Sequence, residues 1–258
     1  MPTLAATPGS PGVGAAAKGR LRRTRKLVRL LAKPPYRTAL RAGVAAAVEH
    51  ESVAFEHDFA SIIDVGAHRG QFALLARARY PRAALYCLEP LTEARTKLEQ
   101  LLENDAGATI IGVAAGRGTG EADFHVSRLT DSSSLLPITN DCVTAFPGTE
   151  ESGMTRVSTA RLDDIFADAP RRPCLLKVDV QGAELEVLIG AERLLDEIDE
   201  IFVECSFVEF YGGQALIDQV IDHVHARGFR LSGIYSVVRD GRGRCLQADL
   251  LFGRRPSA

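Results

Sequence analysis

Residues 61–70 read Ser-Ile-Ile-Asp-Val-Gly-Ala-His-Arg-Gly and set the pattern for the rest of the chain. The apolar start of this stretch predicts a buried strand, and Gln71 to Tyr80 predict a helix that Pro81 ends. Gly66 and Gly70 let the backbone of the intervening turn approach a ligand closely. In an open α/β sheet, ligands bind beyond the carboxyl ends of the strands, so this turn is the first candidate for a binding site.

The same alternation of apolar runs and helical segments continues toward the C-terminus. Strands that alternate with helices predict right-handed βαβ units and a mostly parallel sheet. Asp240-Gly241-Arg242-Gly243 separates two late strands and indicates a hairpin, which adds an antiparallel edge. The further expected strands are 84–88, 109–114, 122–126, 174–178, 201–204, 230–238 and 246–252, the helices are 92–103, 183–195 and 215–227, and a long polar loop spans 128–153.

The composition is that of a folded globular protein. With 46% hydrophobic and 25% charged residues, the chain is neither collagen-like nor disordered, and it has no apolar run long enough to span a bilayer. The five cysteines are far apart and form no Cys-x-x-Cys pair, which argues against a disulfide framework or a cysteine zinc site. These features fit a reducing cytoplasm.

The charge is distributed unevenly along the 258 residues. Residues 1–48 contain ten Lys or Arg and no acid, whereas the remainder has 21 basic and 33 acidic residues. An acidic body repels phosphate backbones, so we expect no nucleic-acid partner. We expect a disordered leader over 1–19, a basic helical extension over 20–58 and a globular domain over 59–258.

The extension suggests two interpretations. A basic helix from about Arg20 to Ala32, which Pro34-Pro35 ends, either lies solvated on the edge of the domain or contacts an anionic membrane surface. The second interpretation would make a cytoplasmic protein peripheral at the inner membrane surface. An Ala-rich helix from Tyr36 to about His50 is expected to cover the first strand.

Two acids follow the first two strands of the expected sheet. Asp64 precedes the glycine turn, and Glu89-Pro90 ends the next strand, nineteen residues after Gly70. Asp64 would repel a pyrophosphate and attract a cationic amino group, and the G-x-G-x-x-G spacing of dinucleotide sites is missing. An acid at the position of Glu89 accepts hydrogen bonds from ribose hydroxyls. Together the two acids predict S-adenosylmethionine, an adenosine that carries an amino acid.

A third motif lies at residues 176–191, which read Leu-Lys-Val-Asp-Val-Gln-Gly-Ala-Glu-Leu-Glu-Val-Leu-Ile-Gly-Ala. This segment resembles the FkbM family of S-adenosylmethionine-dependent methyltransferases, whose pattern here is Leu-Lys-(Ile/Val)-Asp-Val-(Glu/Gln)-Gly-x-Glu followed by Leu-x-Gly-Ala. His68 stands where the family more often has Asn. The resemblance covers about residues 59–252 and includes the turn 64–70, Glu89-Pro90, 132–135, 161–164 and Val203-Glu204.

The resemblance implies a Rossmann-like class I methyltransferase fold: a mostly parallel seven-stranded sheet with an antiparallel C-terminal hairpin and helices on both faces. It also implies methyl transfer to a hydroxyl, commonly of a sugar, a glycolipid or a related secondary metabolite. The residues expected to bind the cofactor are Asp64, Gly66, Ala67, His68, Gly70, Glu89, Pro90 and Ala114.

Methyl transfer is an in-line displacement, so the chain must align the reactants and remove a proton from the hydroxyl. Asp179 is expected as the base, as a hydrogen-bond partner of the hydroxyl, or as the ligand of a divalent metal, with a helix cap as the structural alternative. Gln181 stands where a Glu would supply a second oxygen ligand, which disfavours a tightly held metal. Glu184 and Glu204 are further catalytic candidates; helix-dipole stabilisation and a solvated edge acid are their alternatives.

Ser133 and Ser134 lie in the long loop 128–153. A loop of this length is typical of a lid or a binding loop, so these hydroxyls are expected to close over the acceptor unless the loop is a flexible insertion.

Two other functions remain open at this point. The chain could be a non-catalytic module that keeps the fold for binding or membrane docking, which the basic arm favours. It could also be an NAD-dependent oxidoreductase, which Asp64 and the missing glycines disfavour. The identity of the acceptor and the oligomeric state do not follow from the sequence.

Overall fold

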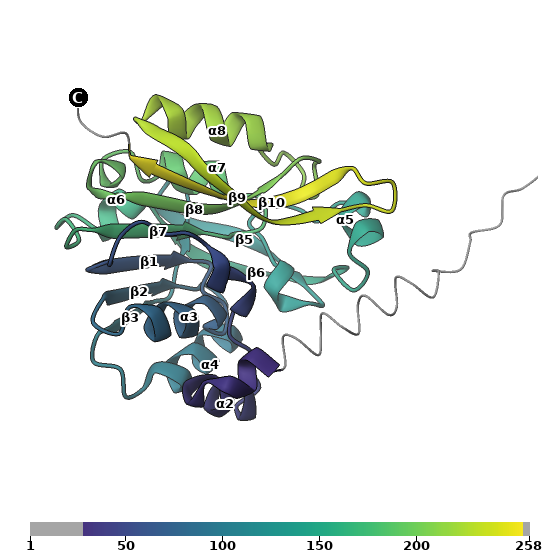
Figure 1. Cartoon of the computed structure of the whole chain (residues 1–258). Coiled ribbons are helices and arrows are strands. Elements are labelled where there is room, and N and C mark those ends of the chain that lie inside the picture. Colours follow the sequence, from purple (N-terminus) through teal and green to yellow (C-terminus); the bar gives the residue numbers. More distant parts are fainter. Residues whose placement is uncertain (1–27, 255–258) are drawn as a thin grey trace, which may run out of the picture.

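A computed structural model describes residues 28–254, and its centre is a seven-stranded sheet (Figure 1). The strand order is β3-β2-β1-β7-β8-β10-β9; the first five strands run parallel, and β10 is antiparallel to both of its neighbours. This confirms the predicted parallel sheet with an antiparallel C-terminal hairpin. The strands are β1 Ser61–Val65, β2 Ala84–Leu88, β3 Ala108–Ile111, β7 Cys174–Val178, β8 Glu200–Ser206, β9 Phe229–Arg239 and β10 Cys245–Arg254.

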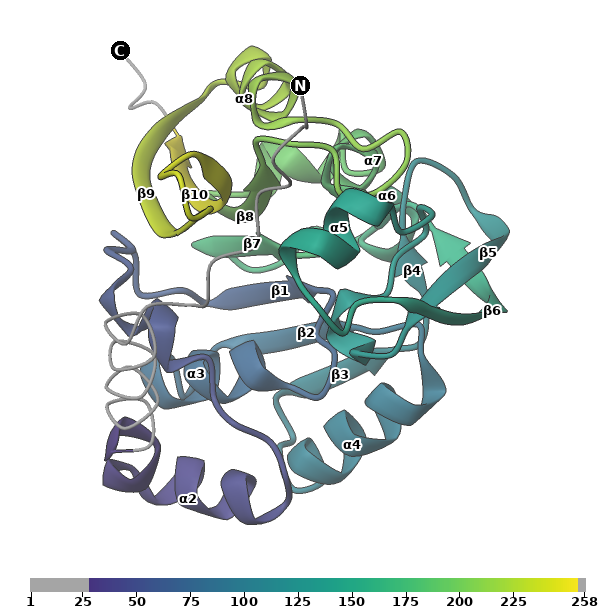
Figure 2. The ribbon, with the colours of Figure 1, turned by 90° about the vertical axis from the view of Figure 1, so that its right-hand side faces the viewer.

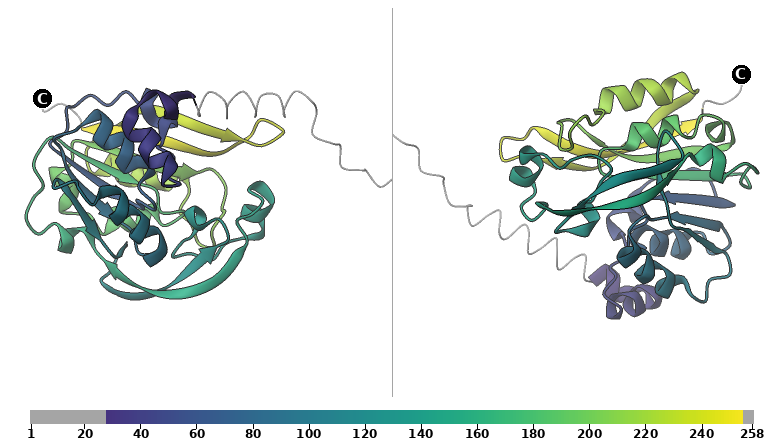
Figure 3. Two further views of the ribbon diagram at one scale, coloured as in Figure 1. Left: turned by 90° about the horizontal axis from the view of Figure 1, so that it is seen from below. Right: turned by 180° about the vertical axis from the view of Figure 1, so that it is seen from behind.

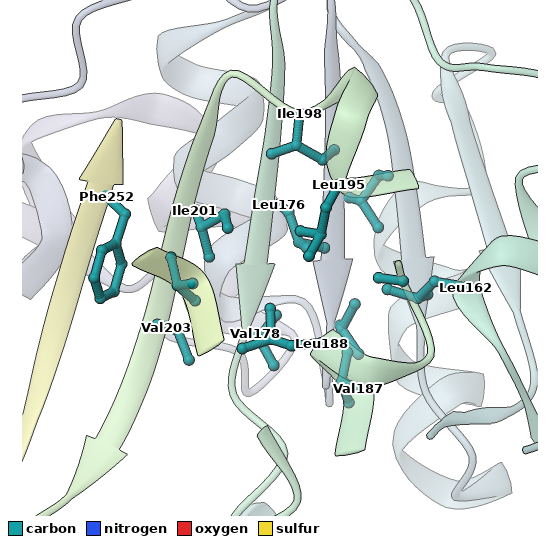
Figure 4. Close-up of a cluster of buried hydrophobic side chains, with 14 of the residues drawn as sticks. Leu162, Leu176, Val178, Val187, Leu188, Leu195, Ile198, Ile201, Val203 and Phe252 are labelled. Atoms are coloured by element: carbon teal, nitrogen blue, oxygen red, sulfur yellow. The ribbon is translucent and has the colours of Figure 1, made fainter. Parts of the chain in front are cut away.

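Helices cover both faces of this sheet, as predicted. Ile63 and alternate residues of the neighbouring strands form one core with α7 (Glu184–Ile189) and α8 (Ile217–Ala226). Ile62 belongs to a second core with α3 (Gln71–Arg79) and α4 (Thr92–Leu102). Figure 4 shows the first core, where side chains of α7 lie against those of β7 and β8. Each buried aliphatic side chain contributes about 1.5–3 kcal/mol, so the two cores fix the strand ends that carry the site.

A small second sheet was not predicted. It consists of β4 (Ala114–Ala115), β6 (Glu151–Ala160) and β5 (Gly120–Ser127), in that order, and lies beside the large sheet in Figures 2 and 3. The predicted strand 109–114 is confirmed as far as Ile111 and is too long at its end, because the chain leaves the large sheet after β3 and Ala114 pairs with Thr159 of β6. Most of β6 is exposed on both sides, so its sequence lacks the alternation that marks a strand.

The predicted loop 128–153 contains regular structure. It holds the 3₁₀ helix η2 (Thr130–Ser132), the helix α5 (Asn140–Ala145) and the start of β6. Thr139 caps α5, because its hydroxyl accepts a hydrogen bond from the backbone N–H of Cys142. The loop is therefore a folded segment that packs on the domain.

Two helices are shorter than predicted. The helix expected over 183–195 ends at Ile189, and the 3₁₀ helix η3 (Leu194–Glu197) follows it. The helix expected over 36–50 is α2 (Pro34–Arg41), because Gly43 leaves the helical conformation with a φ of 82°. The 3₁₀ helix η1 (Val48–Ser52) continues from there, and the short helix α6 (Leu162–Ile165) completes the described elements.

The part of the extension that the structure describes packs on the domain. Tyr36 and Ala39 of α2 share a buried cluster with Leu74 of α3, so α2 covers α3 and not the first strand, as Figure 2 also shows. The predicted leader 1–19 and residues 20–27 of the predicted basic helix lie outside the described residues; residues 28–32 are helical. No helix within residues 28–254 combines the length and the apolar character needed to cross a bilayer.

Candidate active site

Two adjoining cavities lie at the carboxyl ends of the parallel strands. The first is a narrow cleft beyond β1 and β2, and the second is a wide cavity of about 950 Å³. Six residues line both: Gly66, His68, Thr130, Asp131, Asp179 and Gln181. These residues form the junction through which a group held in the cleft would meet a group held in the cavity.

The turn after β1 brings the ends of β1 and β7 into contact. Gly66 has a φ of 77°, and a Cβ atom at this position would lie 1.9 Å from the carbonyl oxygen of Asp179, so no other residue fits. His68 is also left-handed, with a φ of 47°, a conformation that Asn adopts readily. Its ring Nε2 lies 3.0 Å from the hydroxyl of Thr130 and ties η2 to the turn.

Glu89 forms one wall of the narrow cleft. It is 5% exposed, and its carboxylate accepts hydrogen bonds from the backbone N–H groups of His68, at 2.9 Å, and Leu91, at 2.8 Å. Burial raises the pKa of Glu89 to about 7. Five of the residues predicted to bind the cofactor line the cleft: Gly66, His68, Glu89, Pro90 and Ala114. Ala67 lines the wide cavity. Gly70 lines neither cavity and is the N-cap residue of α3.

Asp64 has different surroundings from those predicted. Its side chain is fully buried, it lines neither cavity, and its Oδ1 lies 2.9 Å from the Nζ of Lys177. Burial raises the pKa of Asp64, and the ammonium of Lys177 opposes that effect. The carboxylate thus holds Lys177, which lines the wide cavity, and the predicted contact of Asp64 with the cofactor stays a prediction.

Lys177 connects the ends of β1 and β7. Its Nζ donates to the carbonyl oxygen of Gly66, at 3.1 Å, and lies 3.8 Å from the carboxylate of Asp179. Burial alone lowers the pKa of Lys177, but the carboxylates of Asp64 and Asp179 outweigh burial and raise it above its ordinary value. The sequence reasoning missed this residue, although a lysine inside the apolar strand 174–178 was a visible signal.

Gln181 holds two carboxylates at the junction. Its Nε2 donates to Asp179, at 2.7 Å, and to Glu204, at 3.0 Å, while its Oε1 accepts from the hydroxyl of Tyr211, at 2.9 Å. Burial, followed by the nearby carboxylates of Asp179 and Asp249, raises the pKa of Glu204 well above its ordinary value. Asp179 and Glu204 thus lie side by side on the wide cavity, and Asp179 also reaches the cleft.

The sequence profile described as "Methyltransferase FkbM domain" matches residues 64–231. The chain belongs to the FkbM methyltransferase family. It is an S-adenosylmethionine-dependent methyltransferase, and the fold and the motif resemblance agree with this membership.

The chain is similar to several proteins that are named as methyltransferases. The chain is 28% identical over 168 residues to the 2-O-methyltransferase NoeI of Sinorhizobium fredii, a match that covers 62% of this chain and 69% of that protein. It is 27% identical over 161 residues to Methyltransferase 1 of Beauveria bassiana, over 57% and 65% of the two chains. A solved FkbM methyltransferase from Methylobacillus flagellatus shares the fold at 18% identity and a TM-score of 0.50, over 84% of this chain and 50% of that one. The chain thus spans about two thirds of these relatives and half of the solved structure.

Glu184, which was predicted as a catalytic residue, forms hydrogen bonds within the protein. The carboxylate of Glu184 is buried, lines neither cavity and accepts from the backbone N–H groups of Val180 and Gly182, so it holds the FkbM turn after β7. Burial raises the pKa of Glu184 to about 7. These contacts give Glu184 a structural role in the turn, and its catalytic role stays a prediction.

Ser133 and Ser134 likewise bond within the protein. The hydroxyl of Ser134 donates to the carbonyl oxygen of Gln181, at 2.6 Å, and that of Ser133 accepts from the N–H of Ser127, at 3.0 Å. Both side chains are buried, and only Ser133 of the two lines the narrow cleft. Ser134 thus fastens the loop to the turn after β7 and Ser133 fastens it to β5, while their contact with the acceptor stays a prediction.

The wide cavity is completed by segments outside the matched family domain. Gly43, Val44, Ala45, Ala47, Glu49 and His50 line it on one side and Gln247 on another. His50 is held in place, because its Nε2 lies 3.1 Å from Asp249 and its ring packs edge-on against Phe202 with centroids 5.1 Å apart. Within residues 28–254, no group of three or more His, Cys, Asp or Glu side chains is arranged to hold a metal ion.

Proposed function

We propose that this methyltransferase transfers the methyl group of S-adenosylmethionine to a hydroxyl of a sugar, a glycolipid or a related secondary metabolite. The observation that carries the proposal is Asp179, which lines both cavities and so lies where a cofactor in the cleft and an acceptor in the cavity would meet. The family membership favours methyl transfer over a non-catalytic module or an NAD-dependent oxidoreductase.

The residues of the narrow cleft fit the cofactor by their chemistry. Leu88, Pro90, Val113 and Leu135 supply apolar walls for a flat base, and Glu89 supplies a carboxylate for ribose hydroxyls. The carboxylates of Asp131 and Asp179 at the junction suit the cationic end of the molecule. When bound, S-adenosylmethionine would supply an electrophilic methyl group on a positively charged sulfur.

The wide cavity fits a large polar acceptor. Its volume of about 950 Å³ exceeds what a single small alcohol needs, and carboxylates, amides and hydroxyls line it together with aromatic rings. Phe146 and Phe210 pack edge-to-face with centroids 5.2 Å apart on this wall. Aromatic surfaces beside many hydrogen-bonding groups suit a sugar ring with its hydroxyls. The name of the relative NoeI, a 2-O-methyltransferase, supports oxygen as the accepting atom.

Asp179 is proposed to accept the hydroxyl proton. Its neighbour Glu204 has a pKa raised by burial and by nearby carboxylates, which favours the neutral form of Glu204. The Oδ1 of Asp179 accepts from Gln181, and Lys177 lies 3.8 Å from its other oxygen, which orients the side chain. As the new carbon–oxygen bond forms and the carbon–sulfur bond breaks, the hydroxyl proton passes to Asp179 and from there to water.

Calorimetry and product analysis test this proposal. We expect the purified protein to bind S-adenosylmethionine at micromolar concentration, on the order of −8 kcal/mol, to bind NAD far more weakly, and to lose cofactor affinity in Glu89→Ala. Labelled S-adenosylmethionine is then incubated with a panel of monosaccharides, oligosaccharides and glycolipids, and with matched amines. Label on a hydroxyl oxygen supports the proposal. Transfer to amines alone, or binding of NAD alone, contradicts it.

Three further sequence predictions stay predictions. They are the domain bounds at 19 and 58, the membrane contact of the basic helix from about Arg20 to Ala32 with its location at the inner membrane surface, and the weak or absent requirement for a divalent metal.

A further inference from the structure

The β9–β10 hairpin carries an exposed apolar surface that the proposed reaction does not use. Large hydrophobic side chains that are 36–54% exposed line β9 and the segment after β8, and β9 is the edge strand of the large sheet. Soluble monomers rarely gather such side chains without a partner. Leu231 and Ile234 pair with Phe252 and Leu250 on the face that α7 and α8 cover, whereas Val238 pairs with Gln247 on the face of the wide cavity. We call the exposed apolar side chains on the two faces of this edge, taken together, the hairpin surface: Phe207, Val208, Leu231, Ile234, Val237 and Val238.

The strand register places the hairpin surface beside the wide cavity. Val238 of β9 pairs with Gln247 of β10, which in turn pairs with Ser206 of β8. The backbone N–H of Phe207 donates to the carbonyl oxygen of Leu246, at 2.8 Å. Because Gln247 lines the wide cavity, one end of the hairpin surface adjoins the cavity wall.

The hairpin also projects on the same side of the molecule as the cavity. In Figure 1 it extends beyond the body on the side where α5 lies, and Figure 2 views the molecule from that side. Cys142 of α5 and Phe146, directly after it, line the cavity. A flat partner that covered the hairpin surface would therefore lie next to the cavity.

The charges of the hairpin favour an anionic partner. Arg239, Arg242 and Arg244 are exposed at its tip, and Asp240, the acid of the tip, is paired with Arg244 at 2.7 Å. Apolar side chains next to exposed arginines match the interface of an anionic bilayer, where the former enter the acyl boundary and the latter meet headgroups. Arginines at both ends of β9, Arg230 and Arg239, disfavour antiparallel pairing with a second β9, because like charges would meet.

We propose that the β9–β10 hairpin docks on an anionic membrane surface and so positions the wide cavity beside lipid-attached acceptors. This inference goes beyond the proposed function. It rests on the exposure, register and charge of the hairpin, and its test requires neither methyl transfer nor a known acceptor.

Vesicle co-sedimentation tests the apolar part of the proposal. The full chain is mixed with vesicles of phosphatidylglycerol and phosphatidylcholine in equal parts, and with vesicles of phosphatidylcholine alone. We expect binding to the anionic vesicles only, and a loss of about tenfold or more in affinity for the double variant Val237→Asp/Val238→Asp. The matched control is Met154→Asp, a side chain 63% exposed on β6 of the small sheet, which is expected to bind as the wild type does.

Two further variants distinguish the contribution of the hairpin charges to vesicle binding from that of the basic N-terminal residues. Arg242→Glu reverses a charge at the tip and is expected to weaken binding to anionic vesicles by about tenfold, with a shallower dependence on salt. A truncation that removes residues 1–27, which carry six Lys or Arg, is expected to leave the effect of Val237→Asp/Val238→Asp in place. Calorimetric binding of S-adenosylmethionine by each variant shows that it is folded.

Three results would overturn the proposal. The first is a wild type that does not bind anionic vesicles, and the second is a Val237→Asp/Val238→Asp variant that binds them as tightly as the wild type. The third is a wild type that sediments as a dimer and does not bind vesicles, while the double variant is a monomer. That result would identify the hairpin surface as an interface between two copies of the chain.

Discussion

The narrow cleft and the wide cavity differ in where their walls lie along the chain. The cleft is built from turns that directly follow β1, β2 and β7, together with the segment around η2, all inside the matched family domain. The wide cavity adds residues from 43–50 and from β10, which lie outside that domain and reach it only through tertiary contacts. The narrow cleft therefore lies wholly within the matched domain, whereas the wide cavity takes part of its wall from segments outside it.

Removing Lys177 is expected to have the largest effect, because this buried residue ties the end of β7 to the end of β1. In Lys177→Met the buried carboxylate of Asp64 loses its counter-charge, which costs about 3–5 kcal/mol in the free energy of unfolding. Urea denaturation measures the change. The control Lys97→Met alters an exposed lysine of α4 and should shift stability by less than about 0.5 kcal/mol. Equal stability of both variants would mean that the buried pair does not hold the junction.

Replacing Asp179 is expected to affect catalysis at the point where the cavities meet. Asp179→Asn keeps the shape of the side chain but removes the proton acceptor, so kcat should fall about a hundred- to ten-thousandfold. Single-turnover transfer of labelled methyl measures this, with calorimetry for cofactor affinity. Asp164→Asn, the same change on an exposed acid of α6, should leave kcat unchanged. A nearly normal kcat in Asp179→Asn would assign proton removal to another group.

Glu89 tests the cleft without touching the wide cavity. Glu89→Gln loses charge-assisted hydrogen bonds worth about 1.5–3 kcal/mol, so the Kd for S-adenosylmethionine should rise roughly ten- to hundredfold. The acceptor KM should stay the same at saturating cofactor. Glu99→Gln on α4 is the matched control. A change in acceptor KM that equals the change in Kd would show that the two cavities do not act separately.

The pKa of Glu89 predicts how cofactor affinity depends on pH. Burial raises that pKa to about 7. Below pH 7 the carboxyl group carries a proton and offers fewer acceptor sites, whereas above pH 7 the carboxylate accepts from ribose hydroxyls, so affinity should increase as pH rises through about 7. Calorimetry between pH 5.5 and 8.5, about 1.5 units on either side of this midpoint, measures the profile. Glu89→Gln should flatten it, and an unchanged profile in that variant would refute the assignment.

We expect the smallest effect from replacing His50, which lines the part of the wide cavity that lies outside the matched family domain. His50→Ala removes a ring that packs on Phe202 and faces Asp249, so acceptor KM should rise about fivefold, a loss of roughly 1 kcal/mol, with no change in the Kd for S-adenosylmethionine. His225→Ala, an exposed position on α8, is the control. A weakened cofactor Kd with a normal acceptor KM would place His50 with the cleft instead.

Sequence reasoning reached the parts of the site that lie at strand ends. Glu89 and Asp179 were identified because each follows an apolar strand, and both line the cleft. The sequence indicated Gln181 only as a replacement for a metal ligand. In the structure its side-chain amide donates to both Asp179 and Glu204, and its backbone carbonyl oxygen accepts a hydrogen bond from the hydroxyl of Ser134. Nothing in the sequence around Tyr211 indicates its bond to Gln181, which lies thirty residues away.

The structure of the small sheet and of the extension likewise could not be predicted from local sequence patterns. β6 has few buried side chains, so its pairing with β4 and β5 decides its structure more than its own pattern does. His50 gave no signal of its own, because the residues that hold it, Phe202 and Asp249, lie more than 150 positions further along the chain.

Local sequence patterns are enough to predict the parallel sheet, the antiparallel hairpin, the family and the acids at the strand ends. Apolar periodicity and turn residues are local, and parallel strands bring their carboxyl ends to one edge of the sheet whatever the rest of the chain does. The packed structure is needed to see that Asp64 holds Lys177, that Gln181 joins two carboxylates, and that residues 43–50 complete the wide cavity. These features depend on burial and on contacts between distant segments, which set the charge state and the place of each side chain only after the chain has packed.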